Sequence, residues 1–277
     1  NRSTLKTFVF DKIKGWFLML LIGGSLLAFI AWIYGITKEH FWLYAWGVLG
    51  VFSIFMNMFY AKLIVPLFNK QTALDDGSLK NAIEKYARKI GFKIDNIFVI
   101  DGSKRSTKAN AYFSGFGAQK RITLYDTLIK DMEEPEIVAV LAHEVGHYKK
   151  RHVIYNLILS LLITGFTLYI FSLLAGNQLL SEALNVSESS LHIVLIAFAI
   201  LYAPISEITG FFMNSISRKF EYQADNYAKT TFSGQHLISA LKKLSKKNLS
   251  NLTPHWLYVK IHYSHPPLAA RIKNLKK

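Results

Sequence analysis

The stretch WFLMLLIGGSLLAFIAWIYGIT, from Trp16 to Thr37, contains no charged residue and is apolar on every face of a helix. A helix that is apolar all round lies either in a large protein core or in a membrane. About 20 such residues are needed to cross a bilayer, and this stretch is long enough. It is too long for a cleaved signal peptide, and no small-residue cleavage site follows it. We therefore predict a membrane span.

Three further apolar segments are also long enough to span: Phe41 to Ala61, Val153 to Ser181, and Leu191 to Ser217. The chain of 277 residues is 51% hydrophobic and 14% aromatic, which is high for a soluble protein. The fold class we predict is a mainly α polytopic membrane protein with four transmembrane helices.

The chain has a net charge of +15, and its Lys and Arg residues are distributed unevenly between the regions that the spans separate. The loop between the first two spans holds only Lys38 and Glu39, and the loop from Glu182 to Ser190 has two Glu and no Lys or Arg. Nearly all other cations lie before the first span, in residues 61–152, or after Ser217. Alternating spans place these three regions on one side, which the positive-inside rule makes cytoplasmic. The charge thus indicates topology in a lipid bilayer and not a nucleic-acid partner.

The spans divide the sequence into four parts. Residues 1–65 form a membrane region with two helices, and residues 153–217 form a membrane hairpin. Residues 66–152 and 218–277 are predicted to be the two parts of one domain outside the membrane. The chain has no cysteine, so disulfides and thiolate metal ligands are excluded.

Residues 66–152 have the pattern of a small α/β region that begins after Pro66. Asp75 and Asp76 are candidate caps for a helix that Gly91 ends. Short β-branched and aromatic runs predict strands, the last two forming a hairpin. The predicted strands are Ile97 to Ile100, Asn110 to Ser114, and Arg121 to Tyr125.

A helix opened by Pro135 carries the motif His143-Glu144-Val145-Gly146-His147. The two His residues are four apart, so both imidazoles project from one face and can reach one zinc ion. The Glu in second position is the general base that hydrolysis requires. No third His follows at metzincin spacing, so another ligand is needed.

Two acidic residues downstream, Glu221 and Asp225, lie on the same predicted side of the membrane as the motif. They are four apart and share a helical face, so one can bind the metal while the other orients a ligand His or donates a proton. We predict Glu221 as the ligand and Asp225 in the supporting role. The residues alone leave this order open, and a solvated acidic pair beside Arg218 and Lys219 is the alternative.

Five separate strings resemble the type I CAAX prenyl proteases in sequence, order and spacing, over essentially the whole chain. They are Gly102-Ser103-Lys104-Arg105-Ser106, Asn110-Ala111-Tyr112-Phe113, His143 to His147, Ser217 to Asp225, and His262-Tyr263-Ser264-His265-Pro266-Pro267-Leu268. The resemblance implies a gluzincin with a zincin-like fold and one zinc ion on His143, His147 and Glu221. It also implies Glu144 as general base and Asp225 as proton donor.

The resemblance further implies that Asn110, Ala111, Tyr112 and Phe113 form an edge strand that binds the substrate backbone, and that His265 helps to hold the tetrahedral intermediate. Otherwise Tyr112 and Phe113 are core aromatics and His265 begins a helix. The implied reaction is removal of the C-terminal aaX tripeptide from a prenylated peptide substrate.

Members of that family carry seven spans around a chamber, whereas four are visible here in a chain that begins at Asn1. We therefore expect that three N-terminal spans are missing. A heat-shock-type membrane metalloprotease that degrades misfolded membrane proteins is one alternative, because it shares the His-Glu motif and a later Glu. A membrane scaffold with structural histidines is the non-enzymatic alternative.

Overall fold

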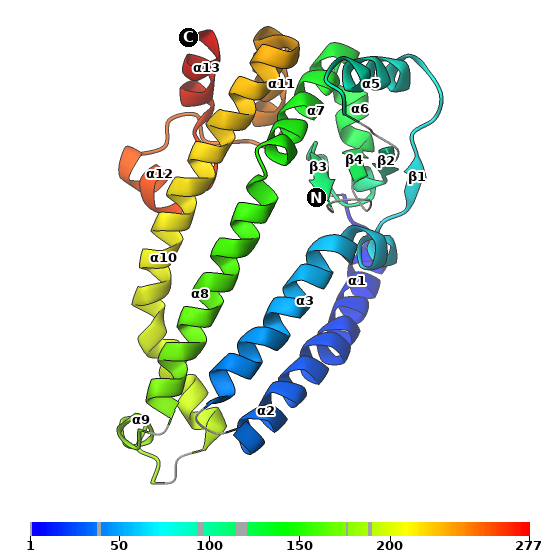
Figure 1. Ribbon diagram of the computed structural model, residues 1–277. Coiled ribbons are helices and arrows are strands. Elements are labelled where there is room, and N and C mark those ends of the chain that lie inside the picture. Colours follow the sequence, from blue (N-terminus) through cyan, green and yellow to red (C-terminus); the bar gives the residue numbers. More distant parts are fainter. Residues whose placement is uncertain (1, 38–39, 93–96, 115–120, 176, 188–189) are drawn as a thin grey trace. The chain divides into compact units, whose positions relative to one another are not determined.

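The computed structural model describes residues 2–37, 40–92, 97–114, 121–175, 177–187 and 190–277 (Figure 1). Contacts within the chain define two compact units. Unit 1 comprises Asn1–Lys14, Phe55–Val153 and Asn214–Lys277, and unit 2 comprises Gly15–Ile54 and Ile154–Met213. Lys38, Glu39 and Glu188, which entered the topology argument, lie outside the described residues.

Among the described residues, four helical segments are long and apolar enough to cross a membrane, in agreement with the predicted number. They are Leu5–Thr37, Phe41–Phe68, His152–Ala175 and Leu191–Lys247. The first comprises α1 (Leu5–Leu18), a π-helical turn (Met19–Gly24) and α2 (Ser25–Thr37), so it begins well before Trp16. The second comprises α3 (Phe41–Leu63) and α4 (Val65–Phe68), with Pro66 in the first turn of α4.

The third predicted span is shorter than expected, because α8 (His152–Ala175) ends before the separate short helix α9 (Leu179–Glu182). The fourth is longer. The predicted span ended at Ser217, but α10 (Leu191–Ala228) continues past that residue and contains Pro204 without ending there. A π-helical turn (Lys229–Ser233) then leads into α11 (Gly234–Lys247).

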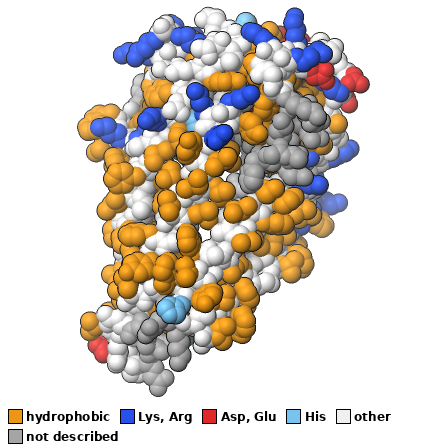
Figure 2. Space-filling view, viewed as in Figure 1, with side chains coloured by type: hydrophobic (Ala, Val, Ile, Leu, Met, Phe, Trp, Pro, Cys, Tyr) orange, Lys and Arg blue, Asp and Glu red, His pale blue; other side chains and the backbone are white. Residues whose placement is uncertain are grey.

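The core of unit 2 is aromatic. Phe171 makes edge contacts with both Phe41 and Phe198, at centroid separations of 5.9 and 5.2 Å. Trp46 donates its indole N–H to the carbonyl of Leu161 at 2.8 Å, so a polar group among apolar helices is satisfied. Outward side chains of these helices are largely hydrophobic and exposed, and Figure 2 shows them covering the visible faces of α8 and α10. This surface is suited to lipid.

Unit 1 contains a four-stranded mixed sheet in the order β1-β2-β4-β3. Strands β2 (Ile97–Ile100), β3 (Ala111–Ser114) and β4 (Arg121–Tyr125) lie where three strands were predicted. The predicted hairpin partners β3 and β4 are antiparallel, and their connection lies outside the described residues. The sequence reading missed β1 (Gln71–Ala73), which is antiparallel to β2, while β2 and β4 are parallel.

Helix α5 (Ser78–Lys89) corrects one detail of the sequence reading, because its N-cap is Gly77 and no side chain caps it. Asp76 instead pairs with Lys80 at 2.6 Å. The predicted stop at Gly91 is confirmed. Gly91 has φ +60°, a conformation that glycine adopts without strain, and the N–H of Phe92 donates to the carbonyl of Ala87 as in a Schellman cap.

The sheet packs with α6 (Asp126–Asp131) and with α7 (Glu134–Lys149), the helix that carries the His-Glu motif. Glu133 caps α7 in a capping box with Glu136, and Pro135 lies in its first turn. Glu136 is only 4% exposed and also accepts hydrogen bonds from Ser239 and Lys243 of α11, each at 2.6 Å. These bonds fix α7 against α11. Two short helices complete the unit, α12 (Trp256–His262) and α13 (Leu268–Lys276).

Candidate metal centre

Close packing of α7 against α10 creates the site. Gly146 lies between the two motif histidines, and a Cβ placed there would come within 3.1 Å of the Cα of Ala224 and of the Cβ of Tyr227. Any larger residue at position 146 would therefore push the helices apart. Glu221 and Asp225 lie one turn apart on α10, on either side of Ala224, so this approach sets their distance from the motif.

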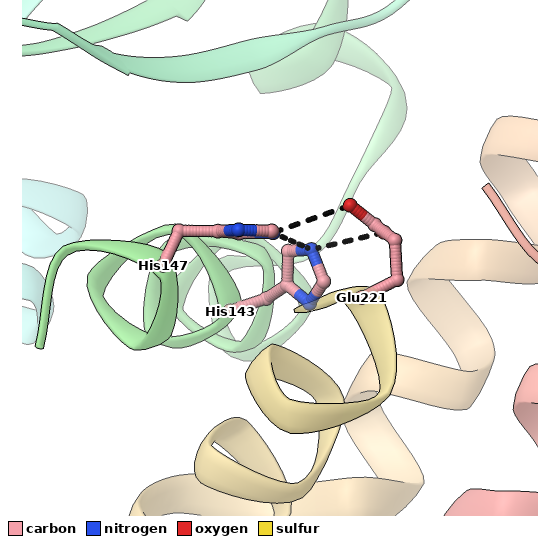
Figure 3. Close-up of side chains that lie close together, drawn as sticks. All are labelled: His143, His147 and Glu221. Carbon is pink, nitrogen blue, oxygen red and sulfur yellow. Dashed lines mark hydrogen bonds and ion pairs between the residues drawn. The ribbon is translucent and has the colours of Figure 1, made fainter. Parts of the chain in front are cut away.

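The side chains of His143, His147 and Glu221 converge on one point (Figure 3). The two Nε2 atoms are 3.1 Å apart, and carboxylate oxygens of Glu221 lie 3.5 Å from His143 Nε2 and 3.3 Å from His147 Nε2. Ligand atoms of a tetrahedral zinc site lie about 3.3–3.6 Å from one another, given metal–ligand distances of about 2.0–2.2 Å. The observed separations fit such a site.

The outer nitrogens of the two rings have partners of their own. His143 Nδ1 is 2.9 Å from a carboxylate oxygen of Asp225, and His147 Nδ1 is 3.0 Å from Nδ1 of His152. A neutral ring that donates from Nδ1 keeps a lone pair on Nε2. Two such lone pairs then face the carboxylate of Glu221. Two imidazole lone pairs and a carboxylate that converge on one point are a ligand set for a cation.

Asp225 is fully buried and is held by Arg271, whose Nε and Nη2 donate to its carboxylate at 2.9 and 2.6 Å. Arg271 Nη1 also lies 3.3 Å from Glu221 Oε2. Burial alone would lower the pKa of His143, but its bonds to Asp225 and Glu221 outweigh that effect and raise the pKa to about 9. A bound cation must therefore displace a proton from this ring, so metal affinity should depend on pH.

Glu144 lies between the motif histidines and lines a cavity of about 470 Å³, together with His143, Glu221 and Asn110. Burial raises the pKa of Glu144, while the nearby histidines and a hydrogen bond from the backbone N–H of Phe113 oppose the rise. A carboxyl group with a raised pKa beside a cation site has the properties of a general base.

Strand β3 is at one end of the sheet and borders the same cavity through Asn110 and Ala111. The carbonyl of Asn110 accepts from the N–H of Tyr125 in β4. Because such bonding alternates along an antiparallel pair, Ala111 and Phe113 direct their backbone groups away from β4. At present the Ala111 N–H is bonded to the side-chain oxygen of Asn110 at 2.9 Å.

His265 lies at the rim of the cavity. Its side chain is 66% exposed, and its Nδ1 is 3.0 Å from Glu221 Oε2. Arg218 of α10 holds the segment that leads to it by donating to the carbonyls of Val259 and Tyr263 at 3.0 and 2.5 Å. Of the predicted site residues, His147 converges with two cavity-lining residues and Asp225 lies behind His143, whereas Tyr112 and Phe113 do not line the cavity. Those that line it are Asn110, Ala111, His143, Glu144, Glu221 and His265.

Three residues of the site were missed. Arg271 resembled other cations of the basic C-terminal tail, and His152 followed three basic residues at the edge of a span. Gln223 was read only as part of the string from Ser217 to Asp225. The sequence offered a signal for His152 alone, because this His directly precedes an uncharged apolar run, where a polar residue usually has a specific role.

The fold and this site define a membrane-embedded zincin-like protein. Residues 73–277 match peptidase family M48, and residues 1–70 match the CAAX prenyl protease N-terminal domain, described as five membrane helices. The chain belongs to peptidase family M48.

Similar proteins agree with this assignment. The CAAX prenyl protease 1 homologs of Oryza sativa subsp. japonica and Arabidopsis thaliana are 38% and 39% identical, over 100% and 99% of this chain. The chain spans 65% of the length of each. The crystal structure of S. mikatae Ste24p superposes with a TM-score of 0.92 at 40% identity, covering 99% of this chain and 67% of that one.

Proposed function

We propose that the chain is a zinc-dependent membrane endopeptidase. The observation that carries this proposal is the convergence of His143, His147 and Glu221 on one point, with Glu144 beside it in a cavity. The two imidazoles and one carboxylate match the His₂Glu ligand set of catalytic zinc sites, which leave the fourth position open.

Zinc held there would polarise a peptide carbonyl and lower the pKa of a water molecule to about 7. Glu144 would accept the proton of that water as it attacks, and then deliver the proton toward the leaving amine. Asp225 is buried behind His143 and bonded to Arg271, so its place supports an orienting role. His265 is at the cavity rim, where a donor can stabilise the tetrahedral intermediate.

The substrate would bind as an extended strand. The outward carbonyls of Ala111 and Phe113 and the N–H of Ala111 offer the pairing that strand addition requires, whereas the Phe113 N–H is bonded to Glu144. The Asn110 side chain must then leave the Ala111 N–H, and its carboxamide becomes available to the substrate backbone. Tyr112 points to the opposite face of the strand, where it makes an edge contact with Tyr125.

The proposed substrates are prenylated peptides that end in a CAAX sequence, from which the aaX tripeptide is removed. The names of the similar proteins support this class, and a lipid-modified tail suits an enzyme with membrane spans. The catalytic unit would face the cytoplasm, because the basic regions of the chain belong to it.

The test measures zinc content and peptide cleavage in the same detergent-solubilised preparation. We expect one zinc per chain and cleavage of a farnesylated Cys-a-a-X peptide after the cysteine, faster than cleavage of the unprenylated peptide or of unfolded casein. Preference for casein would instead favour a quality-control protease. Stoichiometric zinc in a chain that cleaves none of the three would contradict the proposed activity.

A further inference from the structure

The two histidines of the metal site have different partners behind them. His143 Nδ1 faces a carboxylate, that of Asp225, whereas His147 Nδ1 faces the ring of His152 at 3.0 Å. The other nitrogen of His152, Nε2, lies 2.8 Å from the side-chain oxygen of Gln223. His152 is 2% exposed, and its ring stacks on Phe220 at 4.1 Å with an interplanar angle of 8°.

If His147 binds a metal, the hydrogen bonds from His147 to His152 and on to Gln223 can have only one direction of donation. A ligand Nε2 carries no proton, so His147 must bear its proton on Nδ1 and donate it. His152 Nδ1 must then accept, which places the His152 proton on Nε2. Gln223 accepts the hydrogen bond from His152 Nε2 through its Oε1. Each atom has a compatible partner.

A break between two helices brings His152 to this position. In an uninterrupted helix, a residue five positions after His147 would lie about 140° away around the axis. Instead α7 ends at Lys149, and Arg151 adopts φ 59°, a left-handed conformation that is unfavourable for a residue with a Cβ. α8 begins directly at His152. The turn at Arg151 returns the imidazole toward His147.

From this geometry we infer that His152 is a positioning residue for the metal site. It holds His147 in the tautomer whose Nε2 lone pair faces the ion, and Gln223 in turn fixes the tautomer of His152. The inference rests on the proposed zinc site and adds a residue that acts through His147 without touching the ion.

Two substitutions separate hydrogen bonding from packing. His152→Phe keeps a ring that can stack on Phe220 but offers no acceptor to His147. His152→Asn is smaller, but its Oδ1 can occupy the place of Nδ1 and accept the same hydrogen bond. Both are made in the full 277-residue chain. The zinc dissociation constant is measured by chelator competition, and the Co²⁺ absorption spectrum reports the ligand geometry.

We expect His152→Phe to weaken zinc binding about 10- to 100-fold, the usual effect of losing a partner behind a metal ligand. His152→Asn should stay within a few-fold of the unsubstituted chain and keep its Co²⁺ spectrum. Unfolding of the two variants in chelator shows whether both retain the metal-free fold equally. Gln223→Met should lower zinc affinity less than His152→Phe does.

Two results would overturn the inference. One is unchanged zinc affinity in His152→Phe. The other is an equal loss in the Phe and Asn variants, which would mean that the ring only fills space. Failure of the unsubstituted chain to bind zinc would be a different result, since it would remove the proposed function itself.

Discussion

His143 Nδ1 lies 2.9 Å from Asp225, a carboxylate with no solvent exposure that Arg271 holds by two hydrogen bonds. This places a fixed negative charge behind one proposed metal ligand. The ring cannot rotate without breaking the contact, and its donation to Asp225 makes the opposite nitrogen a better ligand.

Asp225→Asn should therefore weaken zinc binding by about 10- to 100-fold, because the amide is a poorer acceptor and leaves Arg271 less compensated. Chelator competition provides the measurement. Asp76→Asn is the matched control, since Asp76 forms an exposed ion pair with Lys80 and should not affect zinc. Wild-type zinc affinity in Asp225→Asn would argue against an orienting role.

Glu144→Ala should retain stoichiometric zinc and lose all measurable turnover, because Glu144 is not one of the three converging ligands but lines the cavity beside them. Zinc content by elemental analysis and cleavage of a farnesylated peptide are measured on one sample. Proteolysis that survives this substitution would exclude Glu144 as the general base.

Gly146→Ala should lower both stability and zinc affinity, since the added Cβ would meet the backbone of Ala224 at 3.1 Å. Overpacking of this kind costs about 1–3 kcal/mol. The control is Gly210→Ala, at a helical glycine with nothing within 4 Å of an added Cβ. Thermal unfolding with and without zinc tests both effects, and equal behaviour of the two variants would show that the helices can separate without cost.

Ala111→Pro should raise KM for peptide substrates and leave zinc content unchanged, because proline removes an outward N–H from β3. Ala73→Pro is the matched control. The carbonyl of Lys70 accepts from Asp101, and the N–H of Leu74 donates to Ile97. Because such bonding alternates along an antiparallel pair, the backbone groups of Ala73 face away from β2. If both variants raise KM equally, binding does not depend on the β3 edge.

Stability of unit 1 should fall in acid through Glu136. Burial alone would raise its pKa, but bonds from Lys243, Ser239 and the Glu133 N–H outweigh that effect and lower it. A lowered folded pKa gives stability that is complete above the unfolded value of about 4.3 and is lost as pH falls through the folded value.

Glu136→Gln should therefore reduce stability at pH 7 and flatten its dependence on pH between about 5 and 3. Denaturant unfolding in chelator, at a series of pH values, gives the difference between the two chains. Lys243→Met should shift the profile in the same direction. Parallel profiles for the parent chain and Glu136→Gln would contradict this assignment.

The parts of the site that lie within one helix could be predicted from the sequence, because helical spacing alone brings His143 and His147 to one face. Glu221 required elimination among few acidic residues, and the fold brings it to the same point. Arg271 and His152 could not be assigned, since a buried cation and a solvated one look alike until tertiary contacts form.

The fold shows the same limit. Strands β2 and β4 have several β-branched residues and were predicted, whereas β1 has three residues and no alternation that distinguishes it from a loop. Strand β1 depends on pairing with the edge of β2, a tertiary contact that its own three residues do not indicate. The continuity of α10 was missed because Arg218 and Lys219 suggested the end of a span, although a helix can extend beyond the bilayer.

The hydrogen bonds from Arg218 to the carbonyls of Val259 and Tyr263 hold the backbone that leads to His265. The loop path depends on main-chain acceptors that every amino acid possesses, while the exposed imidazole contributes little packing of its own. Substitution of His265 should therefore remove the imidazole from the cavity rim while the backbone around it keeps its course, so a change in activity would report on the side chain and not on the loop.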